Sequence, residues 1–303
     1  MKLSYRVRMK RVLLVVFGGL VVACASSPRS ADAPRVEKGG PETERALPIP
    51  VDLAQHIQES IAIGRELYFL DKASAIGTDV LRENVPEPGT RGLGGWLTVR
   101  NGDDHGKVLD SFGVTFITKD EPPRMVFRID VPFKGKPTFK EISPPKDLNE
   151  VGICLFRARQ AAIDAAPRAS RPFNPVIVPG SWVHRRDALA VYLLAAEQRA
   201  GEMVFGIHYR VLVSSDCATV KEVLPLSKTA LVVPPPAESI PPGATPVASF
   251  VSQIVTDWPL ETHVFVSMLH NRTPIYVGTQ RGTWLVIGDK ITLVDDKPPG
   301  DAR

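Results

Sequence analysis

One stretch of the chain, residues 52–82, contains no proline, although the whole sequence has 28. Apolar or small residues recur in it every three or four positions, which is the period of an α-helix. The first stripe comprises Leu53, Ile57, Ile61, Gly64, Tyr68 and Ala75, and a second comprises Ile63, Leu67, Leu70 and Val80. Two stripes give a wide buried face. We therefore predict a long helix, capped by Asp52 at its start, with Gly77 as the position where it could break.

The rest of the folded region alternates strand patterns with shorter helical ones. In residues 125–131 apolar side chains occupy every second position, as in a half-buried strand. That segment and the ones before it, at 96–100 and 107–118, are predicted to form an antiparallel meander. Helices are predicted at 148–165 and 247–258, and strands at 175–178, 190–197, 203–213, 262–269, 274–278, 283–287 and 291–294. This pattern indicates an α+β fold, with antiparallel sheets packed against the long N-terminal helix and two further helices.

Proline content suggests where the folded domain begins. Residues 25–50 contain five prolines and no apolar period, so we expect a disordered tether over 24–50. Residues 234–246 contain six prolines, but the 57 residues that follow are few for an independent core. We therefore expect one α+β domain over 51–303, with a proline-rich surface excursion at 234–246.

The first 24 residues have a different character. Five Lys and Arg side chains and no acidic ones precede Cys24, and residues 12–23 carry no charge. Twelve residues are too few to span a bilayer, which needs about 20. A basic start followed by a short apolar run is typical of a secretory signal peptide.

The end of this run, Val21-Val22-Ala23-Cys24, resembles the cleavage box of bacterial lipoproteins. The resemblance covers residues 1–24 only. It implies that a signal peptide, residues 1–23, is removed and that Cys24 carries lipid, which would anchor the chain to a membrane. In such proteins an aspartate after the cysteine favours retention in the inner membrane. The residue in that position is Ala25, so the resemblance implies a location in the cell envelope, with the outer membrane favoured over the inner one. An ordinary signal peptide or a chance apolar stretch is the alternative.

Removal of the signal changes the charge balance. Without the five cations of residues 1–24, the mature chain has 32 Lys and Arg against 33 Asp and Glu, which gives a net charge near −1. A nucleic-acid-binding domain usually carries a strong positive excess. We therefore predict no nucleic-acid partner.

Two cysteines, Cys154 and Cys217, remain in the mature chain. An even number in an oxidising compartment favours a disulfide, while two buried free thiols are the alternative. The sequence has neither a Cys-x-x-Cys motif nor paired histidine spacing, so it predicts no metal site.

Two of the predicted strands place polar side chains on a common face. If the strands are neighbours, these side chains converge: His208, Arg210, Glu261 and His263. A carboxylate beside a histidine can support acid–base chemistry. Routine cross-strand pairing explains the same residues without any function.

No hydrolase motif or phosphate-binding glycine loop occurs in the sequence. We predict no catalytic residues and no cofactor. The expected function is a non-catalytic binding or assembly module of the envelope, with an envelope protein or glycan as partner. The alternative is an envelope hydrolase that acts on peptidoglycan or lipid.

Overall fold

Helix α1 (Val51–Asn84) is long enough to contact strands of three different sheets and a second helix. The computed structural model describes residues 46–102, 108–185, 187–235 and 248–299, and these lie in one compact unit. Helix α1 is continuous, so the break considered at Gly77 does not occur. A Cβ atom at Gly77 would lie 2.9 Å from Val114, which shows that this glycine lets a strand approach the helix closely.

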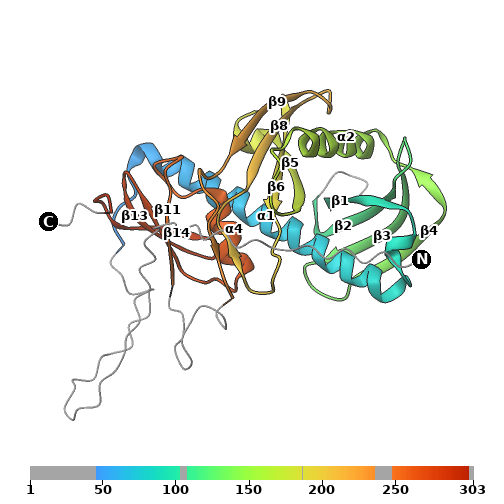
Figure 1. Ribbon diagram of the computed structural model, residues 1–303, viewed down its shortest axis with the longest axis horizontal. Coiled ribbons are helices and arrows are strands. Elements are labelled where there is room, and N and C mark those ends of the chain that lie inside the picture. Colours follow the sequence, from blue (N-terminus) through green and yellow to red (C-terminus); the bar gives the residue numbers. More distant parts are fainter. Residues whose placement is uncertain (1–45, 103–107, 186, 236–247, 300–303) are drawn as a thin grey trace, which may run out of the picture. The chain divides into compact units, whose positions relative to one another are not determined.

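The first sheet is the predicted antiparallel meander (Figure 1). It has the order β1-β2-β3-β4 and comprises β1 (Leu93–Gly102), β2 (Val108–Thr118), β3 (Arg124–Pro132) and β4 (Thr138–Asp147). Strand β4 was not predicted from the sequence. Alternate residues of β2 and β3 are buried in the core shared with α1, among them Phe112, Val114, Phe127 and Ile129. The period-2 pattern therefore identified the inner face of this sheet correctly.

The second sheet is buried on both faces. Its antiparallel order is β5-β6-β8-β9, with β5 (Phe173–Pro179), β6 (Ala188–Ala195), β8 (Tyr209–Ser214) and β9 (Val220–Pro225). One set of β6 side chains, including Tyr192 and Leu194, joins the core at α1, while Val191 and Leu193 pack with helix α2 (Glu150–Ala165). Burial on both faces explains the nearly continuous apolar sequence of β6.

The third sheet has the order β11-β12-β13-β14 and packs against helix α4 (Glu261–Leu269). Its strands are β11 (Ser249–Ser252), β12 (Ile275–Thr279), β13 (Gly282–Ile287) and β14 (Lys290–Asp295). Strand β11 runs parallel to β12, and the other pairs are antiparallel. Two short strands, β7 (Met203–Val204) and β10 (Val232–Val233), pair with each other, and single 3-10 turns lie at η2 (Pro88–Thr90) and η3 (Gly180–Val183). The fold is therefore α+β, as predicted.

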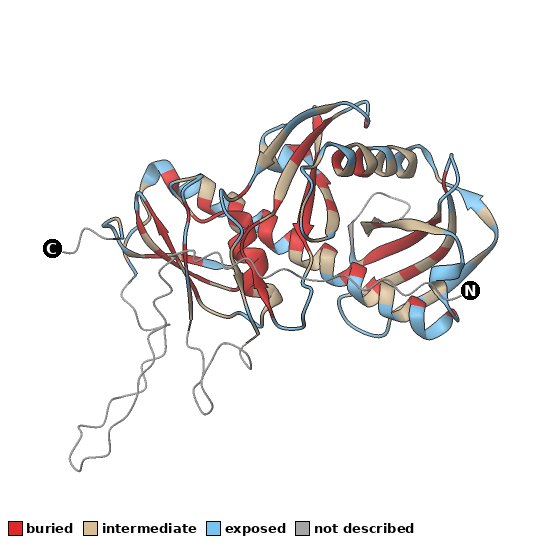
Figure 2. Cartoon of the chain, viewed as in Figure 1, coloured by how far each residue is buried: buried red, intermediate tan, exposed pale blue. Residues whose placement is uncertain are grey.

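The strand prediction for 262–269 is wrong, because this segment is helix α4. Every residue from Glu261 to Ser267 is buried, and Figure 2 shows α4 coloured almost entirely as buried. A short element buried on all sides shows no helical period, and its Val and Phe content favours a strand. Helix α4 packs against α1 at Gly64, where a Cβ atom would lie 2.6 Å from Val264.

The helix prediction for 247–258 is also wrong. Residues 249–252 form β11, and Gln253 N–H donates to the carbonyl of Gly278, which extends the contact with β12. Pairing with an existing sheet satisfies backbone groups and overrides the local helical period. The strand predicted over 203–213 is likewise divided into β7 and β8, because Ile207 takes a positive φ of 64° between them.

The start of the folded domain also differs from the prediction. Leu47 N–H donates to the carbonyl of Leu293 at 2.8 Å, so residues 46–50 belong to the domain and not to the tether. Asp52 does not cap α1, which begins after Pro50, and instead pairs with Arg281. The remainder of the predicted tether, and residues 236–246 of the predicted excursion, lie outside the described residues.

Among the described residues, no helix combines the length and apolar character that crossing a bilayer requires.

Candidate functional site: a cavity lined by carboxylates

The predicted lipid-attachment residue, Cys24, lies outside the described residues. The other two cysteines form a disulfide: Cys154 and Cys217 have their Cα atoms 5.1 Å apart and their sulfur atoms bonded. Cys154 lies on α2, and Cys217 lies in the turn after β8, where its φ is 63°. The bond therefore fixes α2 to the sheet that it covers.

The predicted polar cluster is only partly assembled. Arg210 Nη1 lies 3.4 Å from Glu261 Oε1, and the hydroxyl of Tyr192 donates to the same oxygen at 2.7 Å. Burial raises the pKa of Tyr192 well above its usual value, so the phenol keeps the proton that it donates. This buried group of side chains ties β6 and β8 to the start of α4, which is a structural role.

Neither predicted histidine is paired with a carboxylate. The Nδ1 atom of His208 accepts the Ala195 N–H at 3.0 Å, and Nε2 lies 2.9 Å from the Val204 carbonyl. His263 Nδ1 accepts the Leu260 N–H at 3.0 Å. Burial lowers the pKa of both imidazoles to about 4, so they are neutral near pH 7. An imidazole whose Nδ1 lone pair is used by a backbone amide cannot act there as a general base.

His208 instead forms part of the wall of a cavity of about 210 Å³. The cavity lies where α1, β5, the end of β6 and α4 meet. Its lining combines apolar side chains with titratable ones and contains no Lys or Arg among the described residues: Asp71, Asn174, Leu194, Ala195, Ala196, Glu197, Val204, His208, Phe265, Val266, Leu269 and His270. We call it the Asp71 cavity. A concave, mainly apolar space with a few polar groups is the usual form of a small-ligand site.

Asp71 is the most perturbed acid of the cavity. It continues the apolar stripe of Ile63 and Leu67 on α1, and this places a carboxylate on the buried side of the helix. Its pKa is raised to about 6. Burial is the main cause, the hydrogen bond from Asn174 Nδ2 at 3.2 Å opposes it, and the charge of Glu197 adds to it. The charge that acts on Asp71 among the described residues is that of Glu197, which has the same sign.

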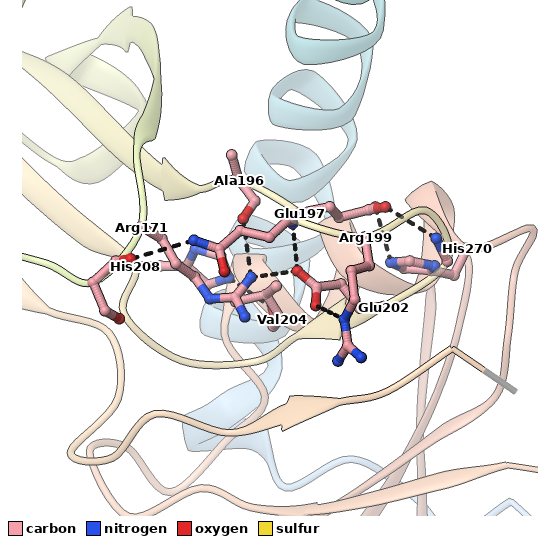
Figure 3. A network of polar contacts seen from close by, with 11 residues as sticks. Arg171, Ala196, Glu197, Arg199, Glu202, Val204, His208 and His270 are labelled. Atoms are coloured by element: carbon pink, nitrogen blue, oxygen red, sulfur yellow. Dashed lines mark hydrogen bonds and ion pairs between the residues drawn. The ribbon is translucent and has the colours of Figure 1, made fainter. Parts of the chain in front are cut away.

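Glu197 lies at the mouth of the cavity, with 30 % of its side chain exposed. Its Oε1 is 3.5 Å from His270 Nε2, and its Oε2 accepts the Gly201 N–H at 3.3 Å. Burial lowers the pKa of His270, while Glu197 acts in the opposite direction. Figure 3 shows the Glu197 side chain directed toward His270. The mouth therefore presents a carboxylate held in place by two contacts.

A second carboxylate, Glu202, fixes the loop that carries Glu197. It accepts hydrogen bonds from Arg171 and, at 2.5 Å, from the Gln198 N–H, and Arg199 Nε lies 3.5 Å away (Figure 3). The hydrogen bond from Arg171 lowers the pKa of Glu202 to about 2, so Glu202 is ionised. Because the side chain of Glu202 is fully buried, this ion pair holds the loop in one arrangement.

Sequence reasoning identified one lining residue, His208, and missed the two acids. A signal for Asp71 is present, because a carboxylate interrupts the apolar stripe of α1 at the i+4 position after Leu67. Glu197 follows a strand and carries no comparable signal. No group of three or more His, Cys, Asp or Glu side chains in the described part of the chain is arranged to hold a metal ion.

Comparison with family models, with curated proteins and with solved structures finds no match to this chain.

Proposed function

We propose that this protein is a lipoprotein, anchored in the outer membrane through Cys24, whose periplasm-facing domain is a non-catalytic module that binds a small ligand in the Asp71 cavity. The observation that carries the binding function is the cavity itself, about 210 Å³ in volume, with Asp71 and Glu197 in its lining. At about 30 Å³ for each water in the liquid, this volume corresponds to roughly seven water molecules. A ligand of similar size would fit.

The membrane anchor rests on Val21-Val22-Ala23-Cys24 and the basic, apolar segment before it. The Cys154–Cys217 disulfide supports an oxidising compartment, because such bonds persist outside the cytosol. A partner in the envelope, either a protein or a glycan, would then bind the domain, while the lipid keeps the domain at the membrane.

One observation favours the alternative of an envelope hydrolase. Asp71 has a pKa of about 6 and lies close enough to Glu197 to be influenced by its charge. A carboxyl group whose pKa lies close to neutrality, near a second carboxyl group, is an arrangement that general acid–base catalysis uses. The histidines give no support to this alternative, because both predicted ones are tied to backbone amides.

Native mass spectrometry of the lipidated protein isolated from bacterial envelopes tests the binding function. We expect a retained small molecule, and we expect Leu269→Phe, which places a larger side chain in the cavity lining, to reduce its occupancy. The absence of any bound molecule, before and after incubation with an envelope extract, would contradict the proposal. Turnover of peptidoglycan fragments or phospholipid that is lost in Asp71→Asn would favour the hydrolase.

A further inference from the structure

Within the Asp71 cavity, the charges of the lining do not balance. Two carboxylates line it, and no Lys or Arg among the described residues does. Burial keeps His208 neutral near pH 7 and lowers the pKa of His270, which lies 3.5 Å from Glu197. From the described part of the chain, Asp71 receives a single hydrogen bond, which a neutral amide donates to Oδ1. A partly buried carboxylate normally acquires a cationic partner or several donors, because losing its hydration is costly.

Other buried acids of this chain follow that rule. Glu66 forms two hydrogen bonds with Arg100, at 2.8 and 2.5 Å, and Glu202 is bound by Arg171. Glu261 accepts from Tyr192 and lies beside Arg210. Asp71 differs from all three. The open volume of the cavity lies beside it, at the place where each of the other acids has a cationic side chain. The described residues of the cavity lining therefore leave Asp71 without a cationic partner.

We propose that the ligand of the Asp71 cavity is a small organic ammonium ion with a short apolar body. This inference rests on the proposed function, namely that the cavity is a ligand site. The ammonium group would occupy the space beside Asp71, with Glu197 at the mouth adding a second negative charge. The apolar body would contact Leu194, Val266 and Leu269.

The lining argues for an organic cation in preference to a metal ion. The described residues provide no set of three metal-ligating side chains, and a hard metal cation needs six or more oxygen ligands. The Phe265 side chain also lines the cavity, and an aromatic face attracts an ammonium group. A cavity that is mainly apolar and has two carboxylates in its lining matches an amphipathic amine.

Isothermal titration calorimetry at pH 7.5 with three probes of one length tests the charge. We expect n-butylammonium to bind at least about tenfold more tightly than n-butanol, which lacks the charge, and n-butyrate to show no binding. Asp71→Asn should remove this preference, while Asp71→Glu should keep it. Asp79→Asn is the matched control, because Asp79 lies on the same helix, is exposed and pairs with Arg82.

The outcomes separate this inference from the proposed function. Equal affinity for butanol and butylammonium, stronger binding of butyrate, or no binding of butylammonium would overturn the ammonium proposal. A neutral or anionic molecule found in the cavity by native mass spectrometry would also overturn it, yet would leave the binding function intact. Only an empty cavity in both experiments would count against both proposals. Thermal unfolding of each variant shows whether a variant that has lost binding is still folded.

Discussion

At the scale of single residues, Asp71 stands out because the fold holds its carboxylate at an energetic disadvantage. Burial raises its pKa to about 6, compared with an ordinary value of 3.8. The folded state therefore binds a proton more tightly than the unfolded chain does. The stabilisation from the protonated form is complete below about pH 4 and is lost as the pH rises through 6. Residues that serve function at the expense of stability behave in this way.

We predict that Asp71→Asn makes the domain more stable at pH 8 and leaves its stability nearly unchanged at pH 4. Two pKa units correspond to about 3 kcal/mol, and partial solvent screening reduces the expected gain to about 1–3 kcal/mol. Asparagine keeps the shape of the side chain and can still accept from Asn174. Urea unfolding at the two pH values measures the difference. A variant less stable than the native protein at pH 8 would show that Asp71 has a structural role.

At the scale of elements, the sequence predicted those whose pattern is long and one-sided. Helix α1 and the meander β1–β3 are correct because each buries one face and exposes the other, which leaves a readable period. Helix α4 was missed because it is buried on all sides, and β11 because sheet pairing overrode a helical period. The candidate site was missed for a related reason: Asp71 and Glu197 are 126 positions apart and meet only through tertiary packing.

The contact between α1 and α4 depends on a glycine. A Cβ atom at Gly64 would lie 2.6 Å from both the Glu261 carbonyl oxygen and Val264 Cβ. We expect Gly64→Ala to destabilise the domain by about 1–3 kcal/mol, because the overlap outweighs the roughly 1 kcal/mol that alanine gains in a helix. Urea unfolding gives the value. Gly89→Ala is the control, since no atom lies within 4 Å of its added Cβ. Equal stability of the two variants would show that α1 and α4 can move apart enough to accommodate the added Cβ without a measurable loss of stability.

At the scale of the whole molecule, the Cys154–Cys217 disulfide adds a covalent cross-link to the packing of the core. The disulfide joins residues separated by 63 positions and connects α2 to the sheet beneath it. A loop of that length corresponds to about 4 kcal/mol of chain-entropy stabilisation, and measured values are often smaller.

We predict that the double variant Cys154→Ser, Cys217→Ser is less stable than the oxidised protein by about 2–4 kcal/mol. The native protein unfolded in a reducing buffer should match the variant, which separates the effect of the bond from that of the serine side chains. Urea unfolding in both buffers measures this. Rapid reaction of both thiols with a maleimide in the native protein, without a reductant, would contradict the presence of the bond.

In the proposed function, the membrane anchor is the property of the whole molecule that determines where the cavity operates. Three acyl chains on Cys24, each adding about 0.8 kcal/mol per buried methylene, would hold the chain at the membrane permanently. We therefore expect Cys24→Ala to abolish incorporation of labelled palmitate and to release the protein from membranes during fractionation. Cys217→Ala is the control, because it breaks the disulfide of the folded domain and should leave both labelling and membrane attachment unchanged. Labelling that persists in Cys24→Ala would show that the segment Val21-Val22-Ala23-Cys24 is not a lipidation site.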